Sequence, residues 1–156
     1  MVRIDIPGWG TIDIENIVLD MNGTIATDGA IPAEVKEKIN VLSEKAKLFI
    51  LTADIQGTAD EETRDMNVEL VKILGEDSKT GKWEFLKTFD LEKTAAIGNG
   101  NNDQLILKES ALGIIVLGDE GLSVSSIKNA DIAVKNISDA LDLFLKPKRL
   151  IATLRE

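Results

Sequence analysis

The feature that most constrains the fold of this chain is a set of apolar runs that each end abruptly in polar residues. The three runs with their polar ends are Ile17–Leu19 with Asp20, Leu48–Leu51 with Thr52, and Ala95–Ile97 with Gly98–Asp103. Short apolar runs bounded in this way are typical of buried strands in a parallel sheet. The carboxyl ends of parallel strands lie on one edge of the sheet, and ligands bind in the crevice there. The sequence therefore predicts one site that collects these three polar segments.

Strand and helix signals alternate along almost the whole chain. The expected strands are Val2–Ile6, Thr11–Ile14, Asn16–Asp20, Lys47–Leu51, Asn67–Leu74, Lys93–Ile97, Leu112–Leu117 and Ile132–Val134. The expected helices are one that begins at Pro32 and then Thr58–Arg64, Lys82–Phe89, Asp103–Ser110, Val124–Asn129, Ser138–Leu145 and Pro147–Glu156. This order predicts an α/β fold, a doubly wound, mostly parallel Rossmann-like sheet with helices on both faces, preceded by a small antiparallel hairpin. Residues 1–156 are expected to form one domain, because no linker, repeat or low-complexity tract interrupts them.

The composition narrows the chemistry of the site. Histidine and cysteine are both absent, which excludes Ser-His-Asp and Cys-His nucleophile systems as well as zinc held by His or Cys. Acid–base and nucleophilic roles then fall to carboxylates and lysines. A site built only from oxygen ligands favours hard cations, above all Mg²⁺.

Charge and hydropathy bear on partners and location. The chain has 18 basic and 27 acidic residues and a net charge of −9, which argues against nucleic-acid binding and anionic membrane surfaces. No apolar run is long enough to span a bilayer, and the first residues lack a signal-peptide pattern. We therefore expect a cytoplasmic protein.

In their order and spacing, the polar segments resemble the motifs of the haloacid dehalogenase (HAD) superfamily. The resemblance rests on Asp20-Met-Asn-Gly-Thr24, Thr52 after an apolar strand, a lysine that opens a helix, and Gly98-Asn-Gly-Asn-Asn-Asp103, and it covers residues 16 to 135. The likeness is strongest to small members related to the phosphorylation domain of P-type ATPases, often called soluble P-type ATPases. Such members lack a cap domain. The short intervals between Asp20, Thr52 and Lys82 here likewise leave no room for one.

The resemblance implies a Mg²⁺-dependent phosphohydrolase, a phosphatase, that forms an aspartyl-phosphate on Asp20. The implied catalytic residues are Asp20, Asn22, Thr52 and Lys82. The implied substrate-binding residues are Gly23, Thr24, Thr52, Ala53, Lys82 and Asn102, and the implied metal ligands are Asp20, Asn22, Asn99 and Asp103. Lys79 and Lys87 remain alternatives to Lys82 as the phosphate-binding lysine. These groups suit phosphoryl transfer, which depends on positioning and charge neutralisation.

Two asparagines depart from the pattern of the family. Asn22 stands where its phosphatases usually carry a general acid–base Asp, and Asn99 stands where the metal loop usually has an Asp. Because loss of a general acid–base group costs about 10²–10⁴ in rate, slow turnover is expected. The same departures leave open a catalytically weak regulatory or phospho-binding protein of this fold. A free-standing ATPase is disfavoured, since no nucleotide-binding insert fits between the motifs.

The missing cap also bears on the substrate. A cap encloses small substrates, and its absence predicts an open site. We expect a phosphorylated substrate that is bulky or macromolecular, or a partner that closes the site. The sequence leaves the oligomeric state open.

Overall fold

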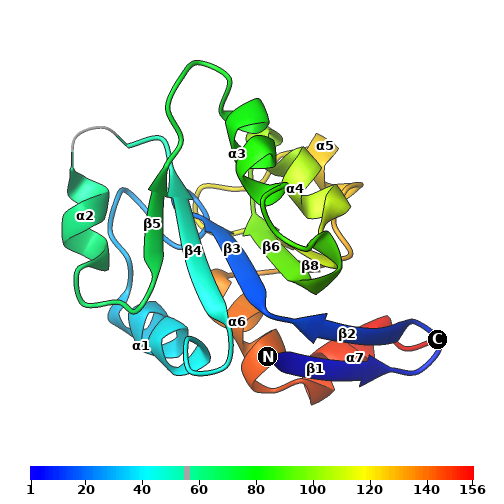
Figure 1. Cartoon of the computed structure of the whole chain (residues 1–156). Helices are drawn as coiled ribbons and strands as arrows, with labels where there is room; N and C mark the ends of the chain where they lie inside the picture. The colour runs from blue at the N-terminus through cyan, green and yellow to red at the C-terminus, as the bar shows by residue number, and fades with distance from the viewer. Residues whose placement is uncertain (55–56) are drawn as a thin grey trace.

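The computed structural model of the chain describes residues 1–54 and 57–156. A two-stranded antiparallel hairpin precedes a six-stranded parallel sheet of order β5-β4-β3-β6-β7-β8 (Figure 1). The strands are β1 (Val2–Ile6), β2 (Gly10–Ile14), β3 (Asn16–Asp20), β4 (Lys47–Thr52), β5 (Glu69–Lys72), β6 (Thr94–Gly98), β7 (Leu112–Val116) and β8 (Ile132–Val134). The predicted α/β fold with its N-terminal hairpin is confirmed.

Helices and two 3₁₀ turns connect the strands. They are α1 (Ala33–Leu42), α2 (Thr58–Thr63), α3 (Ser78–Leu86), η1 (Leu91–Lys93), η2 (Asn101–Asp103), α4 (Gln104–Glu109), α5 (Val124–Ile127), α6 (Ile137–Leu145) and α7 (Lys148–Leu154). None of the helices in the described part of the chain has the length and apolarity that a bilayer crossing demands.

The sheet buries both of its faces, because successive side chains of a strand point to opposite sides. Ile17 and Leu19 of β3 belong to the larger apolar cluster, which includes residues of α1 and α6. Val18 lies between them in sequence and belongs to a second cluster, with Leu86 of α3 and Ile106 of α4. This double burial explains why β3 is an uninterrupted apolar run rather than an alternating one.

The central position of β3 places Asp20 at the switch point of the sheet. β3 pairs in parallel with β4 on one side and with β6 on the other. The chain leaves β3 toward β4 and β5, then returns across the sheet to β6 and continues outward to β8. The carboxyl ends of β3, β4 and β6 carry Asp20, Thr52 and Gly98, so the three polar segments meet at one edge as predicted.

The predicted start of one helix is wrong, and the error affects a site residue. Helix α3 begins at Ser78, four residues earlier than predicted, because the Asp77 side chain caps it by accepting a hydrogen bond of 3.0 Å from the N–H of Thr80. Lys82 therefore lies inside the helix and does not open it. The helix also ends at Leu86 rather than at Phe89.

Other predicted boundaries also differ from the observed ones. β5 is shorter than the predicted strand over residues 67–74, since β4 offers partners only from Phe49 to Thr52. The polar residues after β6 form the 3₁₀ turn η2 before α4 begins at Gln104. These shifts leave the sheet order and the location of the site unchanged.

Candidate active site

Asp20 ends β3, and the chain folds back directly after it. The carbonyl of Met21 accepts a hydrogen bond of 3.3 Å from the N–H of Thr24, and Gly23 adopts a left-handed φ of 77° that favours glycine. This turn brings the Thr24 hydroxyl to Asp20, where it donates to Oδ2 at 3.1 Å. The sequence from Asp20 to Thr24 therefore folds as one unit around the carboxylate.

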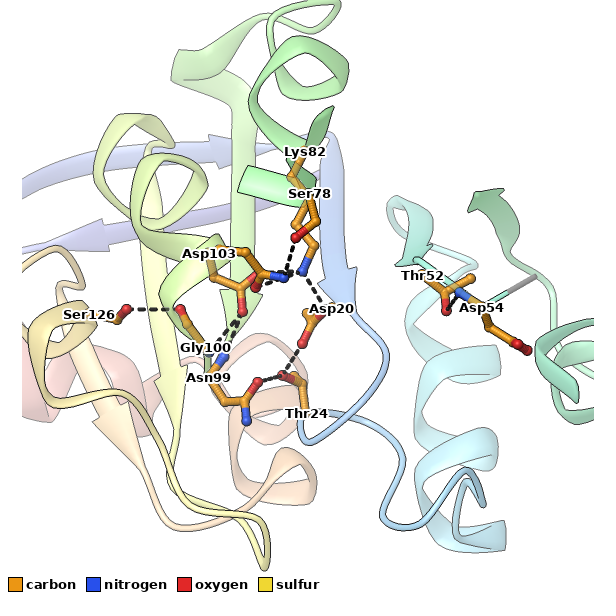
Figure 2. A network of polar contacts seen from close by, with 11 residues as sticks. Asp20, Thr24, Thr52, Asp54, Ser78, Lys82, Asn99, Gly100, Asp103 and Ser126 are labelled. Carbon is orange, nitrogen blue, oxygen red and sulfur yellow. Dashed lines mark hydrogen bonds and ion pairs between the residues drawn. The ribbon is translucent and has the colours of Figure 1, made fainter. Parts of the chain in front are cut away.

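Lys82 reaches Asp20 from α3, and its side chain is almost fully buried. Its Nζ donates to Oδ1 of Asp20 at 2.6 Å, to Oδ1 of Asp103 at 2.8 Å and to Oδ1 of Asn102 at 3.2 Å (Figure 2). The structure thus joins residues 20, 82 and 103 in one buried ionic cluster. Charge-assisted hydrogen bonds of this length are stronger than hydrogen bonds between neutral groups.

The two competing lysines point elsewhere. Lys79 donates to Oε1 of Gln104 at 3.1 Å. Lys87 pairs with Glu84 on the surface of α3 and lies over the ring of Trp83. Of the three candidates, Lys82 is the one that meets Asp20.

Asp103 is fully buried and holds the loop that follows β6. Its Oδ2 accepts hydrogen bonds of 3.0 Å from the backbone N–H groups of both Asn99 and Gly100. Gly98 makes this approach possible, because a Cβ there would lie 2.5 Å from the Asp103 carboxyl carbon. Since its other oxygen accepts a hydrogen bond from Lys82, Asp103 anchors both the lysine and the loop.

The cluster sets the protonation behaviour of Asp20. Burial, with help from the nearby charge of Asp103, raises the pKa of Asp20 to about 7, against the opposing influence of Lys82 and Thr24. Burial alone would lower the pKa of Lys82, but Asp20 and Asp103 outweigh it and the pKa of Lys82 is raised. Lys82 is therefore a cation at neutral pH. A further cation beside Asp20 would lower its pKa and favour the carboxylate.

A cavity of about 370 Å³ opens at this edge of the sheet. Its lining residues are Asp20, Asn22, Ala53, Lys82, Asn99, Gly100, Asn101 and Asn102. The lining includes one carboxylate, one ammonium group and four side-chain amides. Such a surface is suited to a small anion held by hydrogen bonds and one positive charge.

Four of the predicted site residues do not line this cavity. Asp103 lies buried beside Lys82, while Gly23 and Thr24 line a neighbouring cavity of about 540 Å³. Thr52 is buried at the end of β4, and its hydroxyl oxygen accepts a hydrogen bond of 3.0 Å from the N–H of Asp54 (Figure 2). The predicted contact of Thr52 with phosphate stays a prediction.

Several contributing residues were not among the predicted ones. Gly100 and Asn101 line the cavity, and they lie inside the Gly98–Asp103 segment that the sequence had marked. Ser78 accepts a hydrogen bond of 2.9 Å from the Asn102 amide, and Ser126 donates to the carbonyl of Gly100 at 2.8 Å. The sequence around each serine gives no sign of this role, because each serine comes from a segment distant from the residues it contacts.

The oxygens around the cavity fit Mg²⁺ with one protein carboxylate. In residues 1–54 and 57–156, no three His, Cys, Asp or Glu side chains come together as a metal site. The Thr24 hydroxyl lies 3.1 Å from Oδ2 of Asp20 and 3.2 Å from Oδ1 of Asn99, so these two oxygens lie near each other. Asn22 adds an exposed amide to the same cavity. Mg²⁺ commonly takes one or two protein carboxylates and completes its shell with water and substrate oxygens.

Comparison with known proteins gives several sequence relatives. No family model matches the sequence. An uncharacterized protein of Methanocaldococcus jannaschii is 57% identical over 65 residues, which are 42% of this chain and 70% of that protein. The "Soluble P-type ATPase-like phosphatase" of the same organism is 29% identical over 143 residues, 89% of this chain and 52% of that one. The chain thus spans about half the length of that phosphatase.

Solved structures share the fold. The 3-deoxy-D-manno-octulosonate 8-phosphate phosphatase from Moraxella catarrhalis, in complex with magnesium, phosphate and KDO, superposes with a TM-score of 0.71 at 17% identity, covering 91% of this chain and 94% of that one. A Legionella pneumophila protein described as a hydrolase of HAD subfamily III A gives a TM-score of 0.71 at 15% identity, covering 90% and 87%.

The fold and the site together define an α/β protein with a buried Asp–Lys–Asp cluster at the carboxyl edge of a parallel sheet. The matches confirm the resemblance that the sequence predicted. The chain shares its fold with a structure described as a hydrolase of the HAD superfamily and with a phosphatase structure, and its sequence is similar to that of a protein named as a soluble P-type ATPase-like phosphatase.

Proposed function

We propose that this protein is a Mg²⁺-dependent phosphatase that works through an aspartyl-phosphate on Asp20. The observation that carries the proposal is the buried Lys82 ammonium, which lies 2.6 Å from Oδ1 of Asp20, both residues being part of the cavity lining. A carboxylate and a cation so placed suit attack on phosphorus and neutralisation of the charge on its oxygens. The names of the relatives point the same way.

The chain's own residues divide the work. An Asp20 oxygen attacks phosphorus, the bond from phosphorus to the ester oxygen breaks, and the alcohol leaves with a proton from water. Lys82 neutralises charge on the phosphoryl oxygens, and Thr24 holds Oδ2 of Asp20. Water then attacks the aspartyl-phosphate and releases phosphate. Mg²⁺, held by Asp20 and the amide oxygens of Asn22 and Asn99, would supply further charge neutralisation when bound.

The absence of an acid at position 22 makes this reaction slow. Asn22 is exposed at the cavity, and an amide does not exchange protons with a leaving group at neutral pH. The leaving oxygen therefore depends on solvent for its proton. We expect activated aryl phosphates, whose leaving groups need no acid, to be hydrolysed much faster than alkyl phosphates.

A second candidate function is that of a phospho-binding or regulatory protein of the same fold. It is favoured by one observation: among the residues lining the cavity, Asp20 is the sole carboxylate. Such a protein would bind a phosphorylated partner through Lys82 and the amides without turnover.

The substrate that we propose is a phosphate group carried on a bulky molecule. Between β3 and β4 the helix that the structure describes is α1, and between β4 and α3 the described elements are α2 and β5. These are short connections of the sheet, and none of them forms a lid domain. A cavity of about 370 Å³ suits the phosphate group, and the remainder of a substrate would stay outside it.

The test compares wild-type protein with Asp20→Asn on an aryl phosphate, with Mg²⁺ and with a chelator. Asp28→Asn is the matched control, since it removes one exposed carboxylate from the loop that follows Asp20. Asn tolerates the positive φ of 52° at this position. We expect Mg²⁺-dependent turnover in the wild type and the control, none in Asp20→Asn, and a phosphate adduct on the peptide that contains Asp20. Wild-type protein that binds inorganic phosphate but turns over no faster than folded Asp20→Asn would establish the phospho-binding function instead.

A further inference from the structure

Asn99 lies where two loops of the site meet. The loop after β6 is fastened to residues 121–126 by several hydrogen bonds. They run from the Ser123 N–H to the Asn99 carbonyl at 2.7 Å, from the Ser126 hydroxyl to the Gly100 carbonyl at 2.8 Å, from the Ser125 hydroxyl to Asn101 at 2.8 Å, and from the Gln104 amide to Ser125 at 2.9 Å. These two segments therefore form one unit, and the Asp20–Thr24 turn lies beside it.

The side-chain amide of Asn99 connects this unit to the turn. Its Nδ2 donates to the carbonyl of Gly121 at 3.1 Å, and its Oδ1 lies 3.2 Å from the Thr24 hydroxyl, whose one hydrogen it shares with Oδ2 of Asp20. The backbone passes so close that a Cβ on Gly23 would lie 2.4 Å from the Asn99 Nδ2. The amide is therefore enclosed between Gly23, Thr24 and Gly121.

The two ends of the amide are not interchangeable. Gly121 presents a carbonyl, which can only accept, so the nitrogen must face it and the oxygen must face Thr24. A carboxylate at this position has no donor, and one of its oxygens would face the Gly121 carbonyl at the same short distance. Proteins that this chain resembles usually carry an Asp at this position. Here the Gly121 carbonyl accepts a hydrogen bond from the Asn99 amide, which a carboxylate could not donate.

We propose that Asn99 is a positioning residue whose amide ties the loop around Gly121 to the Asp20–Thr24 turn and so holds in place the turn that follows Asp20. Position 99 therefore requires an amide, and a carboxylate there weakens the site rather than restoring it. The effect on turnover rests on the proposed phosphatase function. The effect on the loops does not.

The first measurement is hydrogen exchange of the metal-free protein, followed by mass spectrometry. Asn99→Asp replaces the amide NH₂ by an oxygen and removes the donor to Gly121. We expect amides of residues 117–123 to exchange about 5- to 10-fold faster than in the wild type, the effect of losing one partly buried hydrogen bond. Asn129→Asp is the matched control. It makes the same change in charge and removes a bond of 3.2 Å to the Ser125 carbonyl, but it lies away from the cavity. Its peptide over residues 117–123 should exchange as in the wild type.

The second measurement is the hydrolysis of an aryl phosphate. For Asn99→Asp we expect kcat to fall about 10-fold with KM changed less than about twofold, since the residue holds the turn that follows the nucleophile rather than binding substrate. Thr24→Val should lower kcat when it is made in the wild type. In the Asn99→Asp background it should lower kcat by a clearly smaller factor, because both changes break the contact between Thr24 and residue 99. A residue that only stabilised the fold would give independent effects.

Two results would overturn the proposal. One is unchanged exchange of residues 117–123 in Asn99→Asp. The other is faster turnover or tighter Mg²⁺ binding in that variant, which would mean that the charge gained at the metal site outweighs the lost connection to Gly121. If the wild type has no phosphatase activity, the exchange measurement still decides the role of the amide, so the two failures are distinguishable.

Discussion

Replacement of Lys82 by Met tests the ionic cluster at the centre of the site. Met keeps most of the apolar length of the side chain and removes the ammonium group. Two carboxylates, Asp20 and Asp103, are then left buried, 7% and 0% exposed, without the cation that lies 2.6 and 2.8 Å from them. The variant isolates the contribution of the charge.

The expected loss in the free energy of unfolding is large. Breaking a buried ion pair by removal of one partner costs about 3–5 kcal/mol, because an uncompensated charge stays behind. Lys72→Met is the matched control, since Lys72 contacts Asp60 at the same 2.6 Å but both side chains are exposed. Such surface pairs contribute less than about 1 kcal/mol, and the control should remain close to the wild type.

The loss also has a predicted pH dependence. Without Lys82, burial and Asp103 still raise the pKa of Asp20, and its folded value moves above the wild-type value of about 7, against 3.8 as the ordinary value. A carboxyl group whose pKa is higher in the folded than in the unfolded protein stabilises the fold fully when the pH is below its unfolded-state pKa. That stabilisation is lost as the pH rises through its folded-state pKa. The deficit of Lys82→Met relative to the wild type should therefore widen as the pH rises above about 7.

Urea unfolding of the metal-free proteins at about pH 6 and about pH 9 measures both effects. A deficit below about 1 kcal/mol that is the same at both pH values would refute the reasoning. It would mean that water or a relaxed loop solvates the two carboxylates once the lysine is gone.

Further predictions concern the loop glycine and the acid stability of the fold. Gly98→Ala should lower the free energy of unfolding by about 1–3 kcal/mol, because the new Cβ would overlap the Asp103 carboxyl group; Gly100→Ala, whose nearest neighbour would be 3.2 Å away, should lose clearly less in the same urea titration. Burial raises the pKa of Asp142, but hydrogen bonds from Lys146 and Lys38 outweigh it and hold the pKa below 3.8. The stability that these bonds give is present above pH 3.8 and lost as the pH falls below it, so Asp142→Asn should be about 1 kcal/mol less stable at neutral pH, and its deficit should vanish in acid unfolding. Equal deficits of Asp142→Asn at neutral and acid pH would contradict this.

The sequence could predict the edge of the sheet and much of what gathers there. Asp20 and the segment after β6 follow apolar runs, and the geometry of parallel strands brings such ends together without any knowledge of side-chain contacts. That rule needs only the positions of the strands, and the buried apolar runs in the sequence predict those positions.

The choice of lysine could not come from the sequence in the same way. Lys79 and Lys82 are about one helical turn apart on α3, so both lie on the same side of the helix and the helix geometry does not distinguish them. What separates them is burial, since Lys82 is 2% exposed and enters the ionic cluster. Burial depends on how α3 packs against η2, which is a tertiary contact.

The connections that hold the loops were likewise outside the reach of the sequence. The Asn99 amide meets Gly121 and Thr24, which are 22 and 75 residues away. A backbone carbonyl such as that of Gly121 has no signature in the side-chain sequence. The substitution at position 99 was visible, but its partner was not.

Both ends of the chain lie away from the edge that carries the cavity (Figure 1). The amino group of Met1 donates to the carbonyl of Lys45, just before β4 begins, and the N–H of Glu156 donates to the carbonyl of Pro7 in the hairpin turn at 3.1 Å. The cavity lies at the opposite ends of the strands. A bead, a surface or a reporter protein attached at either end would therefore lie on the side of the molecule away from the cavity.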